Sequence, residues 1–401
     1  MTDEITTGSV TTPVGFKASG IRCGIKQKGK DLALIASDSP ADAAALFTTN
    51  QIKAAPVTLS KRRIKNGKAR AIVINSGNAN ACTGEQGMND AREMSGIVAN
   101  ALALDPEEVL VASTGVIGEY MPMPTLRSGL PEVCRALSAD GGVEAATAIM
   151  TTDTVPKHFA TSFEIDGRTC SIGVIAKGSG MIQPRMATMI CVFTTDVNIE
   201  PHLLQTALTE AVSVSLNSLT IDGEMSTNDC VFILANGAAG NDRIAARNQA
   251  YATFASALRR LSIAVTKALA RDGEGATRLV TVTVRAAESN EQAQTAARAV
   301  ANSLLVKTAI YGQDPNWGRV FSAVGATRAN INPDAVSVKF AGITVAQNGR
   351  AIDYDQDKMK KALSEKEINI EIDLATGEHD WTIFTCDLTH EYITINAEYH
   401  T

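Results

Sequence analysis

The chain has 401 residues, of which 45% are hydrophobic and 20% charged, and its formal net charge at pH 7 is -6. This length and composition allow a large buried core and favour two or three domains over one. The negative charge and the lack of a dense Lys/Arg block argue against nucleic acid as a partner, because neutralising phosphates requires a basic surface.

The start of the chain, "MTDEITTGSV", is acidic and polar, whereas a secretory signal is basic and then apolar. No stretch approaches the roughly 20 apolar residues that span a membrane. We therefore expect a cytoplasmic protein with no membrane partner. The 7 cysteines and 5 histidines are scattered, which predicts reduced structural thiols and neither a disulfide framework nor a metal site.

Helical and extended patterns alternate along the chain, which indicates a mixed α/β protein. The first extended runs are "ARAIVIN", which ends at Asn75, and "EEVLVAST", which ends at Thr114. Between them, apolar residues at helical spacing predict a helix over residues 89–104, capped by Asn89 or Asp90. Further on, "HFATSFEI" and "RTCSIGVIAK" are joined by an Asp-Gly pair, a strong signal for a β-hairpin.

The last third of the chain has its own strand and helix pattern. After "ARDGEGATR" a strand begins at Leu279 and a helix follows. We place a domain boundary near residue 276, so that the domains are 1–275 and 276–401. Alternating apolar residues from Ile368, a turn, and the runs "WTIFTC" and "EYITINAEY" predict a meander whose last strand reaches nearly to the end of the chain.

Residues 178–192 read "GSGMIQPRMATMICV" and allow two interpretations. The first is a turn that leads into a buried strand. The second is a cut before Thr188: the glycines and Pro184 hold the backbone in an unusual turn, and the small Ala187 leaves room for the Thr188 hydroxyl to attack the preceding carbonyl. The freed α-amine, with a pKa of about 7.7 to 8.0, could then act as the base for that hydroxyl.

A resemblance favours the second interpretation. The segment "KGSGMIQPRMATMICVFTTD" resembles the signature of the ornithine acetyltransferase (glutamate N-acetyltransferase, ArgJ) family of arginine biosynthesis, in which the bond before the threonine of "MATM" is cut autocatalytically. Other blocks follow in family order over residues 10–401, among them "INSGNANACTGEQGMNDA", "STGVIGEYMPM", "TTDTVPK", "SLLVKTAIYGQDPNWGR" and "INAEYHT". One departure is Arg185, where the family pattern has Asn.

The resemblance implies an N-terminal-nucleophile-like layered αββα sandwich with a smaller C-terminal α/β domain. It implies cleavage between Ala187 and Thr188 into an alpha chain, 1–187, and a beta chain, 188–401, which associate as a heterotetramer of two of each.

It also implies an acyltransferase that moves the acetyl group from N2-acetyl-L-ornithine to L-glutamate through an acetyl-threonine on Thr188. These small molecules would be its substrates, no cofactor is implied, and acetyl-CoA as a second donor stays open.

The resemblance assigns roles to particular residues. Thr114 and Gly115 match the oxyanion pair, and the substrate-binding positions are Thr151, Lys177, Thr188, Glu274, Asn396 and Thr401. On the residues alone, Thr114 and Gly115 could be a simple turn at a strand exit, and Lys177 and Glu274 could be solvated surface charges.

The sequence leaves two other functions open and contains two motifs that could be misread. An aminopeptidase or amidase could share the self-cleaving fold with water as the acyl acceptor, and a binding protein could keep the fold without catalysis. The loop "SGNANACTGEQG" lacks the Gly-Lys-Ser/Thr of a P-loop, which disfavours nucleotide binding. We interpret "YGQDPNWGR" as a structural corner that supports the second half of the chain.

Overall fold

The computed structural model describes residues 4–183 and 189–398, and the chain divides into two compact units. The N-terminal unit runs to Asn217 and also includes Met225–Val265, whereas the C-terminal unit comprises Ser218–Glu224 and the chain from Thr266. The predicted boundary near residue 276 stays a prediction. The mixed α/β composition of the chain is confirmed.

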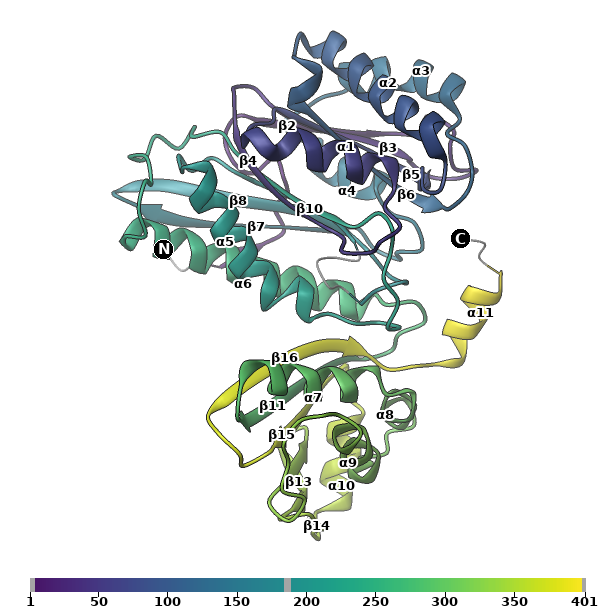
Figure 1. Cartoon of the computed structure of the whole chain (residues 1–401), viewed down its shortest axis with the longest axis vertical. Helices are drawn as coiled ribbons and strands as arrows, with labels where there is room; N and C mark the ends of the chain where they lie inside the picture. Colours follow the sequence, from purple (N-terminus) through teal and green to yellow (C-terminus); the bar gives the residue numbers. More distant parts are fainter. Residues whose placement is uncertain (1–3, 184–188, 399–401) are drawn as a thin grey trace. The chain divides into compact units, whose positions relative to one another are not determined.

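The N-terminal unit contains two sheets in the part of the chain that the structure describes (Figure 1). The six-stranded sheet has the order β1 (Ile5–Thr6), β7 (Lys157–Ile165), β8 (Arg168–Lys177), β9 (Ile190–Thr195), β10 (Cys230–Ala235) and β4 (Asp42–Phe47). The four-stranded sheet has the order β2 (Phe16–Ile21), β3 (Leu32–Ser37), β5 (Ala71–Asn78) and β6 (Val109–Val116). Its helices are α1 (Ala55–Arg63), α2 (Gly84–Leu102), α3 (Met123–Arg135), α4 (Gly142–Ala148), α5 (Pro201–Ser213) and the first part of α6 (Gln249–Arg271), with short 3-10 turns at Ile64–Asn66 and Pro106–Glu108 and the first two residues of a third at Leu216–Ser218.

The two sheets pack face to face, with helices on their outer sides. Strands β3, β4, β9 and β10 are buried along their whole length, as expected when both faces of a sheet are covered. Ile74 of the four-stranded sheet and Phe232 of the six-stranded sheet belong to one apolar core, to which α4 also contributes. Helices α2 and α3 cover the other face of the four-stranded sheet, while α5 and α6 lie on the far side of the six-stranded sheet (Figure 1). The layers therefore follow the order helix, sheet, sheet, helix.

Two local predictions for this unit are tested directly by the structure. The Asp-Gly hairpin is confirmed, because Asp166 and Gly167 both have positive φ angles, 51° and 73°, between β7 and β8. The predicted start of the first long helix is wrong, since α2 begins at Gly84 rather than at Asn89. Its first turn is polar and carries no apolar periodicity. A Cβ atom on Gly87 would lie 1.9 Å from Thr83 Oγ1, so this glycine serves close packing inside the helix rather than a turn.

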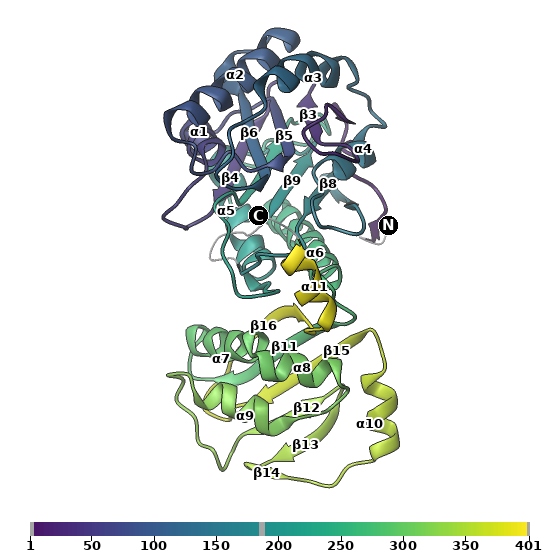
Figure 2. The same cartoon turned by 90° about the vertical axis from the view of Figure 1, so that its right-hand side faces the viewer.

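The C-terminal unit has one described sheet with helices on one face (Figure 2). The strand order is β14 (Arg350–Ala351), β13 (Ile343–Gln347), β12 (Ser337–Phe340), β15 (Glu367–Asp373), β11 (Leu279–Ala287) and β16 (His379–Cys386). The helices α7 (Asn290–Asn302), α8 (Leu304–Tyr311), α9 (Trp317–Gly325) and α10 (Gln356–Leu363) contribute to the core on that face. Within "YGQDPNWGR", Asn316 caps α9 by accepting from the Arg319 N–H over 3.1 Å, which agrees with the interpretation as a structural corner.

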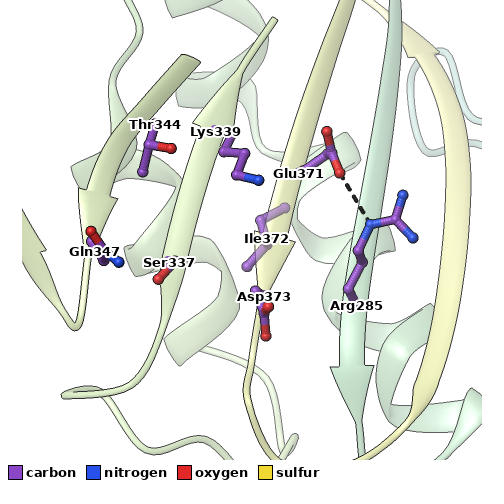
Figure 3. A pocket seen from close by; sticks show the side chains of 8 residues that line it. All are labelled: Arg285, Ser337, Lys339, Thr344, Gln347, Glu371, Ile372 and Asp373. Carbon is purple, nitrogen blue, oxygen red and sulfur yellow. Dashed lines mark hydrogen bonds and ion pairs between the residues drawn. The ribbon is translucent and has the colours of Figure 1, made fainter. Parts of the chain in front are cut away.

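The other face of this sheet is polar. Figure 3 shows Lys339, Thr344, Glu371 and Arg285 around a pocket of about 240 Å³ on that face. Arg285 is paired with Glu371 at 3.0 Å and with Asp380 at 2.9 Å. A polar, ion-paired row of side chains is typical of a sheet face that meets water.

The predicted C-terminal meander is wrong in two respects. Strand β15 pairs with β11 in parallel, and the run predicted as the last strand forms helix α11 (His390–Glu398). The β-branched residues of this run favour a strand, but polar contacts of Tyr392 and Asn396, described below, fix a helix instead, so tertiary contacts override propensity. Within the described ranges, no helix combines the length and the apolar character needed to cross a membrane.

Candidate active site

Thr114 and Gly115 lie near the end of β6, where it runs beside the end of β5. In this pairing Gly115 is opposite Gly77. A Cβ atom on Gly115 would lie 2.3 Å from the Gly77 carbonyl carbon, and the φ angle of Gly115 is 134°. Only glycine fits such a close approach in this conformation. The backbone therefore requires glycine next to the Thr114 side chain.

Buried polar side chains hold the segment that carries Thr114. Ser113 Oγ donates to Asn75 Oδ1 over 2.6 Å, and Asn75 Nδ2 donates to the Asn78 carbonyl over 2.9 Å. Asn228 Nδ2 donates to the Ser113 carbonyl over 2.8 Å. Because Asn75 and Asn228 are buried, these bonds replace those that water would make, and losing one would leave an unsatisfied polar group. The strand end is thus held from several sides.

The Asp153 carboxylate is the centre of a second polar network, and its side chain is fully buried. It accepts hydrogen bonds from the Lys157 ammonium, from the Gly178 N–H at 2.8 Å and from the Thr151 N–H at 3.0 Å. Burial alone would raise the pKa of Asp153, but the ammonium groups of Lys157 and Lys177 and the Gly178 N–H lower it to about 2. The ionised carboxylate therefore ties Thr151 to the turn that begins at Gly178.

Lys177 joins this network to Thr114. It is the last residue of β8 and only 8% exposed, so the interpretation of Lys177 as a solvated surface charge is wrong. Its Nζ donates to Thr114 Oγ1 over 3.3 Å. In the β8–β9 pairing, Lys177 lies opposite Ile190, the first residue of β9. The cation is therefore beside the oxyanion candidate, where the chain leaves one strand and enters the next.

The charges around Asp153 leave an excess of positive charge. Burial lowers the pKa of Lys26; the Lys177 ammonium lowers it further, while the Asp31 and Asp153 carboxylates act in the opposite direction. With Lys157, three ammonium groups face two carboxylates among the described residues, a balance of one positive charge within that part of the chain. Such a site is suited to an anionic ligand such as a carboxylate.

The C-terminal unit carries a separate acidic cluster. Glu274 is 8% exposed, so its interpretation as a solvated charge is also wrong, and its Oε2 accepts from Asn396 Nδ2 over 2.7 Å. The Tyr392 hydroxyl donates to Asp222 Oδ2 over 3.4 Å. Burial, and then the Asp222 and Glu274 carboxylates, raise the pKa of the Tyr392 phenol. Two carboxylates close to a phenol are suited to an ammonium group.

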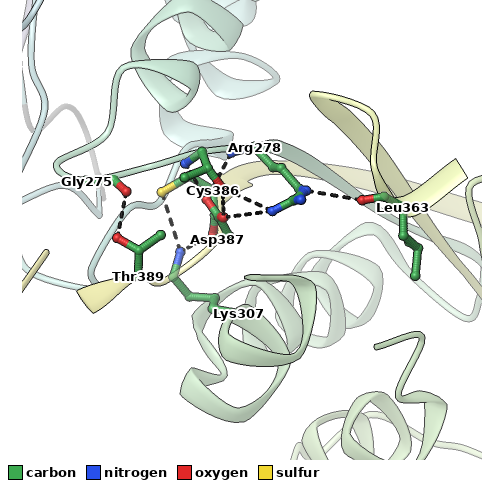
Figure 4. A network of polar contacts seen from close by, with 8 residues as sticks. Gly275, Arg278, Lys307, Leu363, Cys386, Asp387 and Thr389 are labelled. Carbon is green, nitrogen blue, oxygen red and sulfur yellow. Dashed lines mark hydrogen bonds and ion pairs between the residues drawn. The ribbon is translucent and has the colours of Figure 1, made fainter. Parts of the chain in front are cut away.

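A network shown in Figure 4 anchors the chain around this cluster. Asp387 accepts from the Arg278 N–H over 3.0 Å and is paired with the Arg278 guanidinium at 3.6 Å. Thr389 Oγ1 donates to the Gly275 carbonyl over 2.7 Å. Lys307, which is 4% exposed, donates to the last carbonyl of β16. These bonds fix the turn after Glu274 against the segment that leads into α11.

The structure thus groups the predicted site residues by unit. Thr114, Gly115, Thr151 and Lys177 lie in one polar region of the N-terminal unit, and Glu274 and Asn396 are hydrogen-bonded in the C-terminal unit. The predicted cleavage residues Ala187 and Thr188 and the binding residue Thr401 lie outside the described residues.

Sequence reasoning missed Asp153, Lys157 and Asn228. The only signal for the first two was "TTDTVPK", in which an acid and a base stand four residues apart just before a strand. Asn228 had no local signal, because the Ala79 and Ser113 carbonyls to which its side chain donates are 149 and 115 residues away in the sequence. In residues 4–183 and 189–398 no group of three or more His, Cys, Asp or Glu side chains is arranged to hold a metal ion.

Comparison with known proteins gives a consistent result. The ArgJ family matches residues 17–401. An arginine biosynthesis bifunctional protein of Symbiobacterium thermophilum is 48% identical over 397 residues, 98% of this chain and 99% of the relative, and that of Oceanobacillus iheyensis is 45% identical over 395 residues, 98% and 97%.

Two solved structures are also similar. The arginine biosynthesis bifunctional protein from Bacillus halodurans is 41% identical and covers 47% of this chain and 100% of its own, with a TM-score of 0.44. The ornithine acetyltransferase from Mycobacterium tuberculosis, complexed with ornithine, is 41% identical and covers 46% and 99%, with a TM-score of 0.44. From the family match and the near full-length relatives, the chain belongs to the ArgJ family of arginine biosynthesis, and the resemblance found in its sequence is confirmed.

Proposed function

We propose that this protein transfers the acetyl group of N2-acetyl-L-ornithine to L-glutamate, with Thr188 as the nucleophile after the chain is cut between Ala187 and Thr188. The observation that carries the proposal is the Lys177–Thr114 contact beside Gly115, in a member of the ArgJ family. The described chain on either side of the proposed cut leads to this contact, since Lys177 lies opposite Ile190. The short length of chain between this nucleophile and Ile190, two residues, would keep the nucleophile near the Lys177–Thr114 contact.

Thr114 is suited to donate to an oxyanion. Its Oγ1 accepts from the Lys177 ammonium, which has no lone pair to offer in return. The Thr114 hydroxyl proton is therefore available for a negative oxygen, and the nearby cation stabilises the developing charge. We assign Thr114 and Gly115 to the oxyanion of the tetrahedral intermediate, and the tight packing of Gly115 against Gly77 holds this segment in place.

The charge distribution suits amino-acid substrates. The net positive region around Lys177 and Thr151 would receive a substrate carboxylate. The acidic cluster of Glu274, supported by Asn396, would receive the side-chain ammonium of the ornithine moiety. Thr401 completes the proposed substrate-binding set.

The reaction proceeds in two acyl transfers. The Thr188 hydroxyl attacks the acetyl carbonyl, its proton passes to the Thr188 α-amine, and the carbon–nitrogen bond of acetylornithine breaks as the ornithine amine takes a proton. The threonine ester then reacts with the glutamate amine, which forms acetylglutamate and restores the hydroxyl. One residue supplies both nucleophile and base, so the scheme is ping-pong.

Finer features of the proposal come from the family. The relatives are named bifunctional, and we extend the proposal to acetyl-CoA as a second acetyl donor to glutamate. The order of layers in the N-terminal unit agrees with an N-terminal-nucleophile fold. The cut chains 1–187 and 188–401 would stay together, two of each, in the cytoplasm. No cofactor is required by the scheme.

Mass spectrometry of the purified protein tests the cut. We expect chains ending at Ala187 and beginning at Thr188, and a single uncut, inactive chain for Thr188→Ala. Thr188→Ser should still cut but turn over more slowly. An active preparation with only the uncut chain would overturn the proposal.

If Arg185 hinders processing, Arg185→Asn will shorten the processing half-time without changing the turnover of cut enzyme. Equal half-times for the variant and the wild type would show that Arg185 does not affect processing.

Assays with separate donors test the reaction. Acetylglutamate formation from acetylornithine and glutamate supports the transferase, and formation from acetyl-CoA supports the second donor. Release of free acetate at the same rate with and without glutamate would instead support the amidase alternative, in which water is the acceptor.

A further inference from the structure

The loop between β2 and β3 contacts the segments that carry the candidate site residues, and the proposed function gives it no role. The loop is built on Asp31, which is fully buried. The Asp31 carboxylate accepts from the N–H groups of Cys23, Gly24 and Lys26 over 2.6, 3.0 and 2.9 Å. Three backbone donors on one buried carboxylate replace the water that it has lost and fix the course of the loop.

Asp31 also ties this loop to β5. The Ser76 N–H donates to the Asp31 carbonyl over 2.9 Å. Ser76 lies opposite Thr114 in the pairing of β5 with β6. Asp31 is therefore bonded to the loop through its side chain and to the strand beside Thr114 through its backbone. The position of the loop is coupled to the strand end that carries the oxyanion candidates.

The aliphatic stem of Lys26 packs on the end of β5 at Gly77. A Cβ atom on Gly77 would lie 2.8 Å from Lys26 Cγ, and the φ angle of Gly77 is 104°. A larger residue at this position would displace the lysine stem as well as strain the backbone. Gly77 lies opposite Gly115. Lys26 and Gly115 therefore both pack against the same residue of β5.

The ammonium of Lys26 reaches the segment that carries Thr151. Its Nζ donates to the carbonyl of Met150, the residue before Thr151, over 2.9 Å. A second bond from the same region runs to this segment, because Ser76 Oγ donates to the Ala148 carbonyl over 2.7 Å. The two bonds hold residues 148–151 against the end of β5. Lys26 thus spans from the β5–β6 pairing to the backbone beside Thr151.

We propose that Lys26 is a positioning residue of the acetyl-transfer site, whose ammonium holds the Met150–Thr151 backbone in register with Thr114 and Gly115. The inference rests on the proposed function, in which Thr151 binds the substrate and the other two residues bind the oxyanion. Lys26 acts through these residues and is not itself assigned a contact with the substrate.

The geometry predicts which kinetic constant depends on Lys26. Its ammonium donates to the carbonyl beside a substrate-binding residue, whereas the nucleophile and the oxyanion donors are separate groups. Loss of the ammonium should therefore weaken substrate binding more than it slows the chemical step. A residue needed only for folding would instead lower the free energy of unfolding, and a different cation in its place would give no specific recovery.

Three variants of the full chain separate these roles. Lys26→Met keeps an aliphatic stem over Gly77 but removes the ammonium. Lys26→Arg keeps a cation with several N–H donors. The matched control is Lys28→Met, which removes an exposed charge from the same loop. For each variant we would measure KM and kcat with acetylornithine at saturating glutamate, the Kd of ornithine by calorimetry, and unfolding in urea.

We expect Lys26→Met to raise KM for acetylornithine and the Kd of ornithine about tenfold, as for the loss of one charge-assisted hydrogen bond. Its kcat should stay within about threefold of the wild type. Lys26→Arg should bring both constants back to within about threefold, and Lys28→Met should behave as the wild type does.

Unchanged KM and Kd in Lys26→Met, or a loss that Lys26→Arg does not recover, would overturn the proposal. A lower kcat and a lower free energy of unfolding at unchanged Kd would also overturn it, because Lys26 would then serve stability alone. If the wild type forms no acetylglutamate, the proposed function fails, whereas the Kd of ornithine in the three variants still decides the role of Lys26.

Discussion

Replacing Asp153 by Asn tests whether the buried network beside Lys177 is organised by charge. The pKa of this carboxyl is lowered from its ordinary value of 3.8 to about 2, which corresponds to about 2 kcal/mol of stability at neutral pH. The substitution also leaves the buried Lys157 ammonium without its carboxylate. Breaking a buried ion pair from one side costs about 3 to 5 kcal/mol in other proteins, so we expect a loss of that size in the free energy of unfolding.

Urea titrations followed by circular dichroism measure the loss. The control is Asp38→Asn, which breaks the exposed Lys17–Asp38 pair and should cost less than about 1 kcal/mol. The double variant Asp153→Asn/Lys157→Met removes both buried charges and should recover at least half of the loss. A single variant within about 1 kcal/mol of the wild type, or a double variant no more stable than the single one, would refute the reasoning.

The same group predicts a pH dependence. Because the pKa of Asp153 is lower in the folded protein, its stabilisation is present above pH about 4 and is lost as the pH falls from about 4 to about 2. The stability difference between the wild type and the Asp153→Asn variant should therefore shrink over this range. A difference that stays constant from pH 7 to pH 2.5 would contradict the assignment.

Three further substitutions test the site. Gly115→Ala should abolish most of the activity, because its Cβ would meet the backbone of β5 at 2.3 Å, whereas Gly118→Ala, with nothing within 4 Å, should keep more activity; equal losses would count against the close approach. Thr114→Ala should lower kcat about a hundredfold if its hydroxyl is an oxyanion donor, and a loss below about threefold would assign that role to the backbone amide alone. Asn396→Ala, which removes the 2.7 Å bond to Glu274, should raise KM for acetylornithine more than it lowers kcat, and an unchanged KM would remove the acidic cluster from substrate binding.

Local signals explain which parts of the fold could be predicted. The Asp166-Gly167 hairpin depends on backbone conformations that these two residues favour, so sequence was sufficient. The start of α2 was misplaced because its first turn is polar and Gly87 packs closely against Thr83 there. Helix α11 was predicted as a strand because its β-branched residues were considered without the partners that select a helix.

The site residues also divide into features that the sequence could predict and features that it could not. Thr114, Lys177 and Glu274 could be named from family blocks, but their burial could not, because it depends on neighbours distant in the chain. Lys177 contacts Thr114 across 63 positions of sequence. Asp153, the residue that ties the turn at Gly178 to Thr151, lies in the block "TTDTVPK", but its role became visible only through its contacts.

The acetyl-threonine intermediate is the central claim, and one measurement tests it most directly. The cut enzyme is incubated with acetylornithine in the absence of glutamate, digested and analysed by mass spectrometry. The account predicts one added acetyl group on the chain that begins at Thr188, located on Thr188 itself and removed when glutamate is added. An acetyl group on a cysteine, or no acetyl group on either chain while ornithine is released, would contradict it.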